Sequence, residues 1–265
     1  MLPIVHPVFL HPAGRMPSLK TLLIGTPLYR PARAVRRLFR GRERRRRERH
    51  TIAFYRALLP EGARVFDIGA NVGYVAEALQ RAGARVVAVE PQPGCLAELR
   101  ARCGGRAGFV AVPGVVGRAA GTATLYLRPH HAASSLRRDW LGETVGTLEV
   151  PMTTLAELIE RFGVPAYCKV DVEGAEEDVF ATLPHPLPPV SFEYHRSGLD
   201  RAAACLEMLS RDADAEVNLN HAGPLRFALP RWIPADEFRA GMMERLGHPS
   251  APTYGDIWVR TKPSS

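Results

Sequence analysis

One stretch of the chain joins an apolar run to a turn of small residues and then to a helical pattern. Residues 64–68 form the apolar run, and Gly69 to Gly73 form the turn. Apolar residues then recur at helical spacing as far as Leu79. The order strand, glycine turn and helix follows from this pattern. Because glycine has no Cβ, such a turn brings backbone N–H groups and a helix N-terminus close to a ligand, which predicts a nucleoside-containing cofactor.

Strand and helix patterns alternate along the rest of the chain. Apolar runs predict strands over residues 85–90, 109–112, 166–172, 189–195, 215–220 and 254–259. Helical spacing predicts helices over residues 93–103, 155–159, 175–183 and 201–209. This alternation predicts an α/β fold with a mostly parallel, doubly wound sheet. Residues 122–127 alternate differently and predict an antiparallel strand at the margin of the sheet.

Polar side chains gather where the predicted strands end. They are Asp67, Glu90, Asp171, Glu173, Glu193 and His195. In an open α/β sheet, ligands bind beyond the carboxyl ends of the strands, so these residues predict an active site at that edge. Residues 130–140 form a polar loop that either folds over a substrate or only connects its neighbours.

The residues around the glycine turn favour one class of cofactor. The turn lacks the G-x-G-x-x-G pattern of dinucleotide sites, and Asp67 stands two places before Gly69. A carboxylate there would repel a phosphate, whereas it suits S-adenosylmethionine, which carries an ammonium and a sulfonium group. Glu90 lies 21 positions beyond Gly69. An acidic residue at about that distance accepts hydrogen bonds from ribose hydroxyls, so Asp67 and Glu90 are predicted cofactor ligands.

Several segments together resemble the FkbM family of methyltransferases over residues 53–260. The segments are Val-Phe-Asp-Ile-Gly-Ala-Asn-Val-Gly (65–73), Val-Glu-Pro (89–91), Thr-Leu-Ala-Glu-Leu (154–158), Cys-Lys-Val-Asp-Val-Glu-Gly-Ala-Glu (168–176) and Ser-Phe-Glu (191–193). The K-x-D-x-E-G-x-E pattern within residues 169–176 is the most specific of them. One departure is Ala156, which stands where the family usually has Asp.

The resemblance implies a Rossmann-like, seven-stranded sheet whose last strand is antiparallel, with S-adenosylmethionine as the methyl donor. It also implies O-methylation of a small molecule or glycan. By position, the residues that resemble the cofactor loop are Gly69, Ala70, Asn71 and Gly73. Glu90 with Pro91 resembles the ribose-binding segment, and Asp171 resembles the residue at the tip of the fourth strand.

Methyl transfer to a hydroxyl needs a group that removes the proton during attack. Asp171, Glu173 and His195 are the candidates for this step. Glu173 and Glu176 have an alternative role as acids that stabilise a helix N-terminus, and His195 has one as a surface residue. Asp171 and Glu173 alone lack a third ligand, so no metal site is predicted.

The basic residues belong mainly to one segment. The net charge is +8, and most of the excess comes from the arginines that precede residue 50. We therefore expect two parts: a proline-rich lead-in with an arginine-rich arm in residues 1–50, and a methyltransferase domain in residues 51–265. The arm is either a solvated basic helix or a patch for nucleic acid or another anionic surface. Two further hypotheses follow, a nucleic-acid methyltransferase that uses the arm and a non-catalytic cofactor-binding scaffold.

The cysteines and the apolar segments predict the surroundings of the chain. The four cysteines show neither a C-x-x-C pair nor a metal-type spacing with histidine. We therefore expect reduced thiols and a cytoplasmic protein. No apolar stretch reaches the roughly 18 residues that span a bilayer, so no transmembrane segment is expected.

Overall fold

The computed structural model describes residues 45–183, 188–211 and 214–261. The longer strands are β1 (Arg64–Ile68), β2 (Arg85–Glu90), β3 (Phe109–Pro113), β5 (Gly121–Leu127), β6 (Gly146–Thr153), β7 (Tyr167–Val170), β8 (Val190–His195), β9 (Ala215–His221) and β11 (Tyr254–Thr261). The two-residue strands are β4 (Val115–Val116) and β10 (Ile233–Pro234). The helices are α3 (Tyr74–Arg81), α4 (Pro93–Cys103), α5 (Leu155–Phe162), α6 (Glu176–Phe180), α7 (Leu199–Ser210), α8 (Ala235–Ala240) and α9 (Met242–Leu246). Short 3-10 turns are η1 (His131–Ala133) and η2 (Arg196–Gly198).

The helix that precedes β1 covers residues 45–58, and Arg47–Ser265 forms a compact unit. The proline-rich lead-in and most of the arginine-rich arm lie outside the described residues. The prediction of a separate arm therefore stays a prediction.

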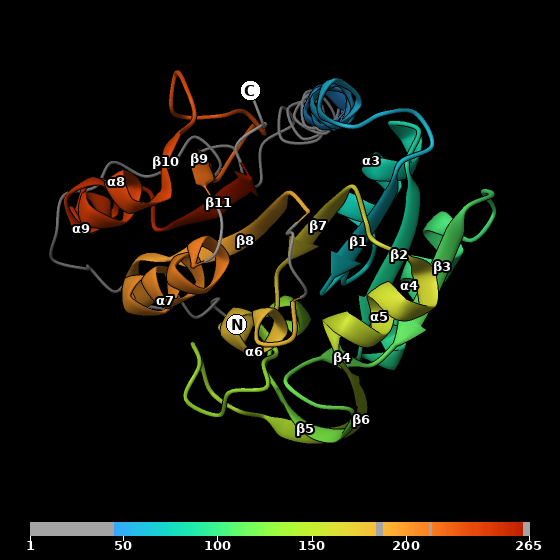
Figure 1. Ribbon diagram of the computed structural model, residues 1–265. Coiled ribbons are helices and arrows are strands. Elements are labelled where there is room, and N and C mark those ends of the chain that lie inside the picture. Colours follow the sequence, from blue (N-terminus) through green and yellow to red (C-terminus); the bar gives the residue numbers. More distant parts are fainter. Residues whose placement is uncertain (1–44, 184–187, 212–213, 262–265) are drawn as a thin grey trace, which may run out of the picture. The chain divides into compact units, whose positions relative to one another are not determined.

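The main sheet has the strand order β10-β9-β11-β8-β7-β1-β2-β3 (Figure 1). β3, β2, β1, β7 and β8 are parallel neighbours. β11 lies antiparallel between β8 and β9. The Rossmann-like sheet with an antiparallel last strand is thereby confirmed. The short β10 pairs with β9 at the edge and adds an eighth strand to the seven that were expected.

The strand expected at the margin of the main sheet, over residues 122–127, belongs instead to a separate sheet. β5 pairs antiparallel with β6, and β4 pairs parallel with β6 (Figure 1). The alternation of β5 buries Leu125 against Val115 and Val150 in a small core. Alternation decides which side of a strand is buried but not which strand becomes its partner, so the prediction of a marginal position was wrong.

Helices cover both faces of the main sheet, as the alternation of segments predicted. On one face, Tyr55 of the helix before β1 packs into a cluster with Leu99 of α4. On the other face, Leu155 of α5 and Leu206 of α7 pack with Phe192 of β8. Each fully buried large apolar side chain contributes about 1.5–3 kcal/mol, so the two clusters stabilise the sheet whose edge carries the polar residues.

Helix α5 shows how local sequence sets a helix start. The Thr154 side chain accepts a hydrogen bond from the Glu157 N–H at 3.1 Å, and the Glu157 carboxylate accepts one from the Thr154 N–H. This reciprocal capping box satisfies two N–H groups of the first turn. Ala156, where the family usually has Asp, is exposed on this helix, and the cap forms without it.

Helices near the carboxyl end differ most from the sequence expectations. α6 spans only Glu176–Phe180, although the pattern predicted a helix over residues 175–183. α8 and α9 were not predicted at all, because each is one or two turns long and Gly241 separates them. Phe238 and Met242 are nevertheless buried against the main core. Tertiary burial rather than local periodicity therefore stabilises these short helices.

The cysteines and the helices agree with two expectations about the chain. Cys95, Cys103, Cys168 and Cys205 are free and buried. Among the described residues, no helix combines the length and the apolar character needed to cross a membrane.

Candidate active site

The turn between β1 and α3 lies at the carboxyl end of β1, where the predicted cofactor loop was expected. Gly69 and Gly73 have φ angles of 83° and 84°, and Asn71 has a φ of 50°. The Gly69 N–H donates to the Val89 carbonyl at 3.0 Å, which joins the turn to β2. A Cβ on Gly69 would overlap the carbonyl oxygen of Asp171. Glycine is therefore required here both for its backbone angle and for the close approach of the chain after β7.

Glu90 is the last residue of β2, and its carboxylate binds the backbone of the turn between β1 and α3. Its Oε2 accepts a hydrogen bond from the Asn71 N–H at 2.9 Å, and its Oε1 accepts one from the Gln92 N–H at 2.8 Å. The residue is only 3% exposed, and this burial raises the pKa of the carboxyl, while the two backbone N–H groups lower it. Each carboxylate oxygen has two lone pairs, so Glu90 keeps acceptor capacity for a ligand hydroxyl.

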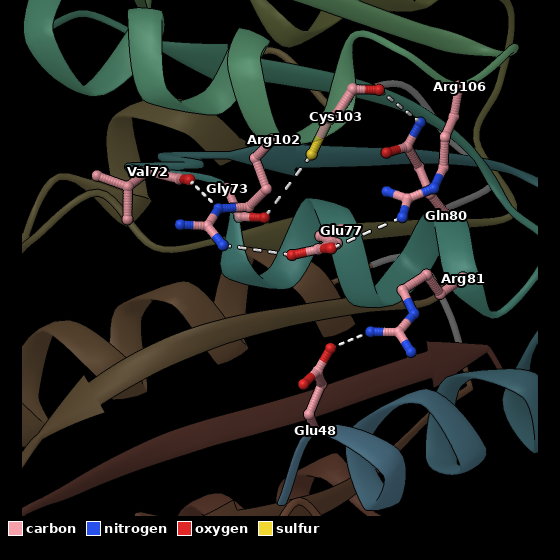
Figure 2. Close-up of polar contacts among 9 residues, drawn as sticks. All are labelled: Glu48, Val72, Gly73, Glu77, Gln80, Arg81, Arg102, Cys103 and Arg106. Carbon is pink, nitrogen blue, oxygen red and sulfur yellow. Dashed lines mark hydrogen bonds and ion pairs between the residues drawn. The ribbon is translucent and has the colours of Figure 1, made fainter. Parts of the chain in front are cut away.

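Side chains of helix α4 contact the carbonyl groups of the same turn (Figure 2). Arg102 Nε donates to the Val72 carbonyl at 2.8 Å, and Arg102 Nη1 lies 3.3 Å from Glu77 Oε2. The Cys103 thiol lies 3.8 Å from the Gly73 carbonyl oxygen. Contacts from a neighbouring helix therefore fix the carbonyl side of the turn while its N–H side faces Glu90.

A cleft opens over these elements and encloses about 510 Å³ of space, part of it open to solvent. Its lining comprises Ile68, Gly69, Asn71, Val89, Glu90, Pro91, Gln92, Gly114, Val115, Val116, Leu125, His131, Ala132, Ser134, Leu136, Asp171, Val172 and Glu173. We call this space the first cleft. Its lining combines carboxylates such as Glu90 and Asp171 with apolar side chains such as Val115 and Leu125, which suits a ligand with a hydroxylated part and a flat apolar part.

The carboxylates of Asp171 and Glu173 lie in the turn between β7 and α6. Lys169 Nζ lies 2.6 Å from Asp171 Oδ2, and Lys169 is 7% exposed. Glu173 has a φ of 56°, a left-handed conformation that is uncommon for a residue with a long side chain. The Trp140 Nε1–H donates to Glu173 Oε2 at 3.0 Å. Burial nevertheless raises the pKa of Glu173 to about 7.

Glu193 of β8 joins these two carboxylates. One oxygen each of Asp171, Glu173 and Glu193 lies within 4.8 Å of the others. Burial and the charges of Asp171 and Glu173 raise the pKa of Glu193 far above its usual range. Like charges this close disfavour ionisation, so Glu193 keeps its proton at neutral pH.

A second cavity has Glu193 of the carboxylate cluster in its lining and encloses about 250 Å³, again partly open to solvent. It is lined by Trp140, Gly174, Glu176, Phe192, Glu193, Tyr194, His195, Gly198, Arg201, Ala202 and Cys205. His195 Nδ1 lies 2.6 Å from the Ser197 hydroxyl. Burial, followed by the charge of Arg196, lowers the pKa of His195, which favours the neutral imidazole at neutral pH.

The structure brings together most, but not all, of the predicted site residues. The predicted residues that line the first cleft are Gly69, Asn71, Glu90, Pro91, Asp171 and Glu173, whereas His195 lines the second cavity. Ala70 and Gly73 belong to the turn but do not line the first cleft.

Asp67 also lies outside the lining of the first cleft, because its side chain is buried within the sheet. It is 1% exposed, and no hydrogen bond of good geometry reaches its carboxylate oxygens among the described residues, although the backbone N–H of Ala76 lowers its pKa. Burial raises its pKa to about 6, although the neighbouring Lys169 opposes that shift. A strand pattern predicts that a residue lies near the end of a strand, but the pleat of the strand decides to which face of the sheet its side chain points. The spacing between Asp67 and Gly69 did not show the direction of the Asp67 side chain.

The main contribution that sequence reasoning missed comes from segment 128–145, which connects β5 and β6. His131, Ala132, Ser134 and Leu136 line the first cleft, and Trp140 lines the second cavity. Gln92 Nε2 donates to the His131 carbonyl at 2.8 Å. Of the two interpretations left open for residues 130–140, the structure therefore favours contact with the site. No local pattern could have identified these contacts, since they join residues distant in the sequence.

Three solved structures illustrate what the chain resembles. The precorrin-6y C5,15-methyltransferase of Geobacter metallireducens is 13% identical, with 82% of this chain and 87% of that chain covered and a TM-score of 0.43. The O-methyltransferase of Bacillus cereus in complex with SAH is 9% identical, with 82% and 80% covered and a TM-score of 0.44. The TehB-like SAM-dependent methyltransferase of Corynebacterium glutamicum is 11% identical, with 88% and 100% covered and a TM-score of 0.40.

Comparison with families gives the decisive result. No curated protein matches the chain. The family model of the methyltransferase FkbM domain matches residues 67–213, which contain the glycine turn, Glu90, segment 128–145 and the carboxylate cluster. The chain therefore belongs to the FkbM methyltransferase family, and its methyl donor is S-adenosylmethionine.

Proposed function

We propose that the protein methylates a hydroxyl group of a small molecule or glycan. The observation that supports this reaction is the position of Glu173, which lines the first cleft and belongs to the carboxylate cluster. Burial raises its pKa to about 7. A hydroxyl is a poor nucleophile until its proton is removed, and a base whose pKa lies near the working pH is suited to that step.

The first cleft fits S-adenosylmethionine by the chemistry of its lining. Glu90 offers carboxylate oxygens to ribose hydroxyls, and the apolar side chains of Val115 and Leu125 offer a surface for adenine. The charge of Asp171 suits the cationic part of the donor. When bound, the donor supplies an electrophilic methyl group attached to a sulfonium.

Alignment is the main task of the residues around the donor. Asp171 is held by the buried ammonium of Lys169, and the chain at Asp171 packs against Gly69 without room for a Cβ. A rigid arrangement of this kind favours reaction because correct positioning of two reactants contributes up to about 7–11 kcal/mol. Glu173 removes the acceptor proton, and neutral His195 in the second cavity is the other candidate base.

The test uses S-adenosylmethionine labelled in its methyl group and fractionated cell extract. We expect label in small molecules or glycans, in a form that survives mild alkali, because a methyl ether is stable where a methyl ester is hydrolysed. Label in RNA would support the nucleic-acid methyltransferase instead, and label in protein would also overturn the proposed acceptor class. Donor binding without transfer to any fraction would support the non-catalytic scaffold.

Substitutions separate the roles of the candidate residues in the same assay. Asp171→Asn should abolish transfer, and Glu173→Gln should lower its rate by about 10²–10⁴-fold if Glu173 is the base. Glu160→Gln changes an exposed carboxylate and is the matched control. If Glu173→Gln keeps the full rate while His195→Gln loses it, His195 is the base.

A further inference from the structure

Arg128 makes several hydrogen bonds to the backbone and side chains of segment 128–145, to which it belongs. This side chain belongs to a residue that is only 5% exposed. Its Nε donates to the Leu141 carbonyl at 3.1 Å, and its Nη1 donates to the Thr144 hydroxyl. Its Nη2 lies 3.2, 3.1 and 3.1 Å from the carbonyl oxygens of residues 137, 138 and 140. One buried guanidinium therefore gathers the backbone of the segment around itself, and a Lys ammonium has no fork of donors to replace it.

The segment then docks on the turn that carries Glu173. Ser135 Oγ donates to the Glu173 carbonyl at 2.6 Å, and Arg137 Nε donates to the Gly174 carbonyl at 2.6 Å. Trp140 makes the contact to the Glu173 side chain through its indole N–H. Backbone and side chain of Glu173 are thus both held by the same segment.

Gly174 makes room for the indole. A Cβ on Gly174 would overlap the six-membered ring of Trp140, and its φ is 91°. The Arg201 guanidinium lies 5.5 Å from the indole centroid, and His195 meets the indole edge-to-face with 6.5 Å between ring centroids. Trp140 is therefore enclosed by groups from the β7–α6 turn, from β8 and from α7, and its N–H has a fixed direction.

We propose that Trp140 is a positioning residue whose indole N–H holds the Glu173 carboxylate in place for proton removal, and that Arg128 keeps Trp140 there. This proposal rests on the proposed function, in which Glu173 is the base. A fixed donor also selects one orientation of a carboxylate whose backbone is already in a sparsely populated conformation. The hydrogen bond stabilises the ionised carboxylate, so its removal favours the protonated form.

Other charges around Glu173 act on the same equilibrium and stay in place in the test. Those that face it are Asp171, Glu176 and Glu193, which disfavour ionisation, and Lys169, which favours it. Arg137 binds the adjacent carbonyl, and His195 lies beyond the indole. Changing only the N–H of Trp140 therefore isolates one contribution.

The test measures the pKa of Glu173 in the full chain without any acceptor. The carboxyl carbons of glutamate are labelled with ¹³C, the Glu173 resonance is assigned with Glu173→Gln, and the titration is repeated in Trp140→Phe. Trp140→Phe keeps an aromatic ring but lacks the N–H, and we expect the Glu173 pKa to rise by about one unit. Trp232→Phe is the matched control, because Trp232 lies against Arg260. An unchanged Glu173 pKa in Trp140→Phe overturns the proposal.

A second measurement examines Arg128. In Arg128→Met we expect trypsin to cleave after Arg137 and Arg138 about tenfold faster than in the parent protein, because the segment opens locally. The pKa of Glu173 should rise as in Trp140→Phe. Cleavage at the parent rate would remove Arg128 from the proposal, and if this variant does not fold, Trp140→Phe still decides the role of the indole.

The extract assay separates this proposal from the proposed function. If both hold, the rate of label transfer rises with pH through the pKa of Glu173, and Trp140→Phe moves that rise to higher pH by the same amount as the titration. If the pKa moves but Glu173→Gln keeps the full transfer rate, the contact exists but Glu173 is not the base. In that case both the positioning role of Trp140 and the assignment of Glu173 as the base are wrong, while the proposal of O-methylation is unaffected.

Discussion

The carbonyl oxygen of Asp171 occupies the space that a side chain on Gly69 would need. The two residues directly follow the neighbouring parallel strands β1 and β7, and the Asp171 N–H donates to the Ile68 carbonyl at 2.9 Å. The contact joins the glycine turn between β1 and α3 to the carboxylate cluster without any intervening side chain. The site is therefore built on backbone contacts at the carboxyl edge of the sheet.

Gly69→Ala should disrupt this contact. The backbone strain of a positive φ alone costs about 1–3 kcal/mol, and the overlap with Asp171 adds to it. We expect a lower melting temperature and loss of S-adenosylhomocysteine binding by calorimetry. Gly94→Ala is the control, because a Cβ there meets nothing within 4 Å. Binding by Gly69→Ala at the parent affinity would contradict the close approach.

Glu90→Gln should weaken cofactor binding. The amide of Gln accepts through one oxygen, so one of the N–H groups of Asn71 and Gln92 would face an NH₂ group. Hydrogen bonds to a charged group are worth about 1.5–3 kcal/mol, so we expect at least about tenfold weaker S-adenosylhomocysteine binding. Glu98→Gln alters an exposed acid on α4 and should leave the affinity unchanged.

Arg102→Ala tests the support that α4 gives to the turn (Figure 2). The substitution removes the bond to the Val72 carbonyl and the ion pair with Glu77. We expect S-adenosylhomocysteine affinity to fall about fivefold, corresponding to roughly 1 kcal/mol. Arg100→Ala changes an exposed arginine of the same helix. Equal affinities in the two variants would show that α4 does not organise the turn.

Asp67→Asn should change how stability depends on pH. Burial raises the pKa of Asp67 from 3.8 to about 6, so the folded state holds its proton more tightly than the unfolded state does. The parent protein therefore loses stability from this group as pH rises from 3.8 to about 6. The loss is on the order of 3 kcal/mol, and Asn, which has no such titration, should avoid it.

The measurement for Asp67 is urea unfolding at a series of pH values. Asp67→Asn should gain stability relative to the parent as pH rises through this window and keep a constant advantage above it. Asp200→Asn, at an exposed position, makes the same charge change and should run parallel to the parent. A parallel curve for Asp67→Asn as well would show that burial does not raise the pKa of Asp67.

Local sequence was sufficient for the parts of the site that depend on backbone conformation. The glycine turn, Glu90 at the end of β2 and the acids after β7 lie where the sequence placed them, because strand ends and positive φ angles leave clear residue patterns. The role of Asp67 as a cofactor ligand stays a prediction. Asp67 lies near a strand end as predicted, but it is the register partner of Lys169 and does not line the first cleft.

The sequence by itself determined the α/β order, the glycine turn, the acidic strand ends and the family, because each depends on residues that are neighbours in the chain. Only the tertiary structure decided which side chains meet at the site. Trp140 reaches Glu173 across 33 positions, and Arg128 folds the segment that makes this possible. Such contacts depend on how a separate small sheet packs beside the main one. The spacing of residues along the chain does not predict that packing.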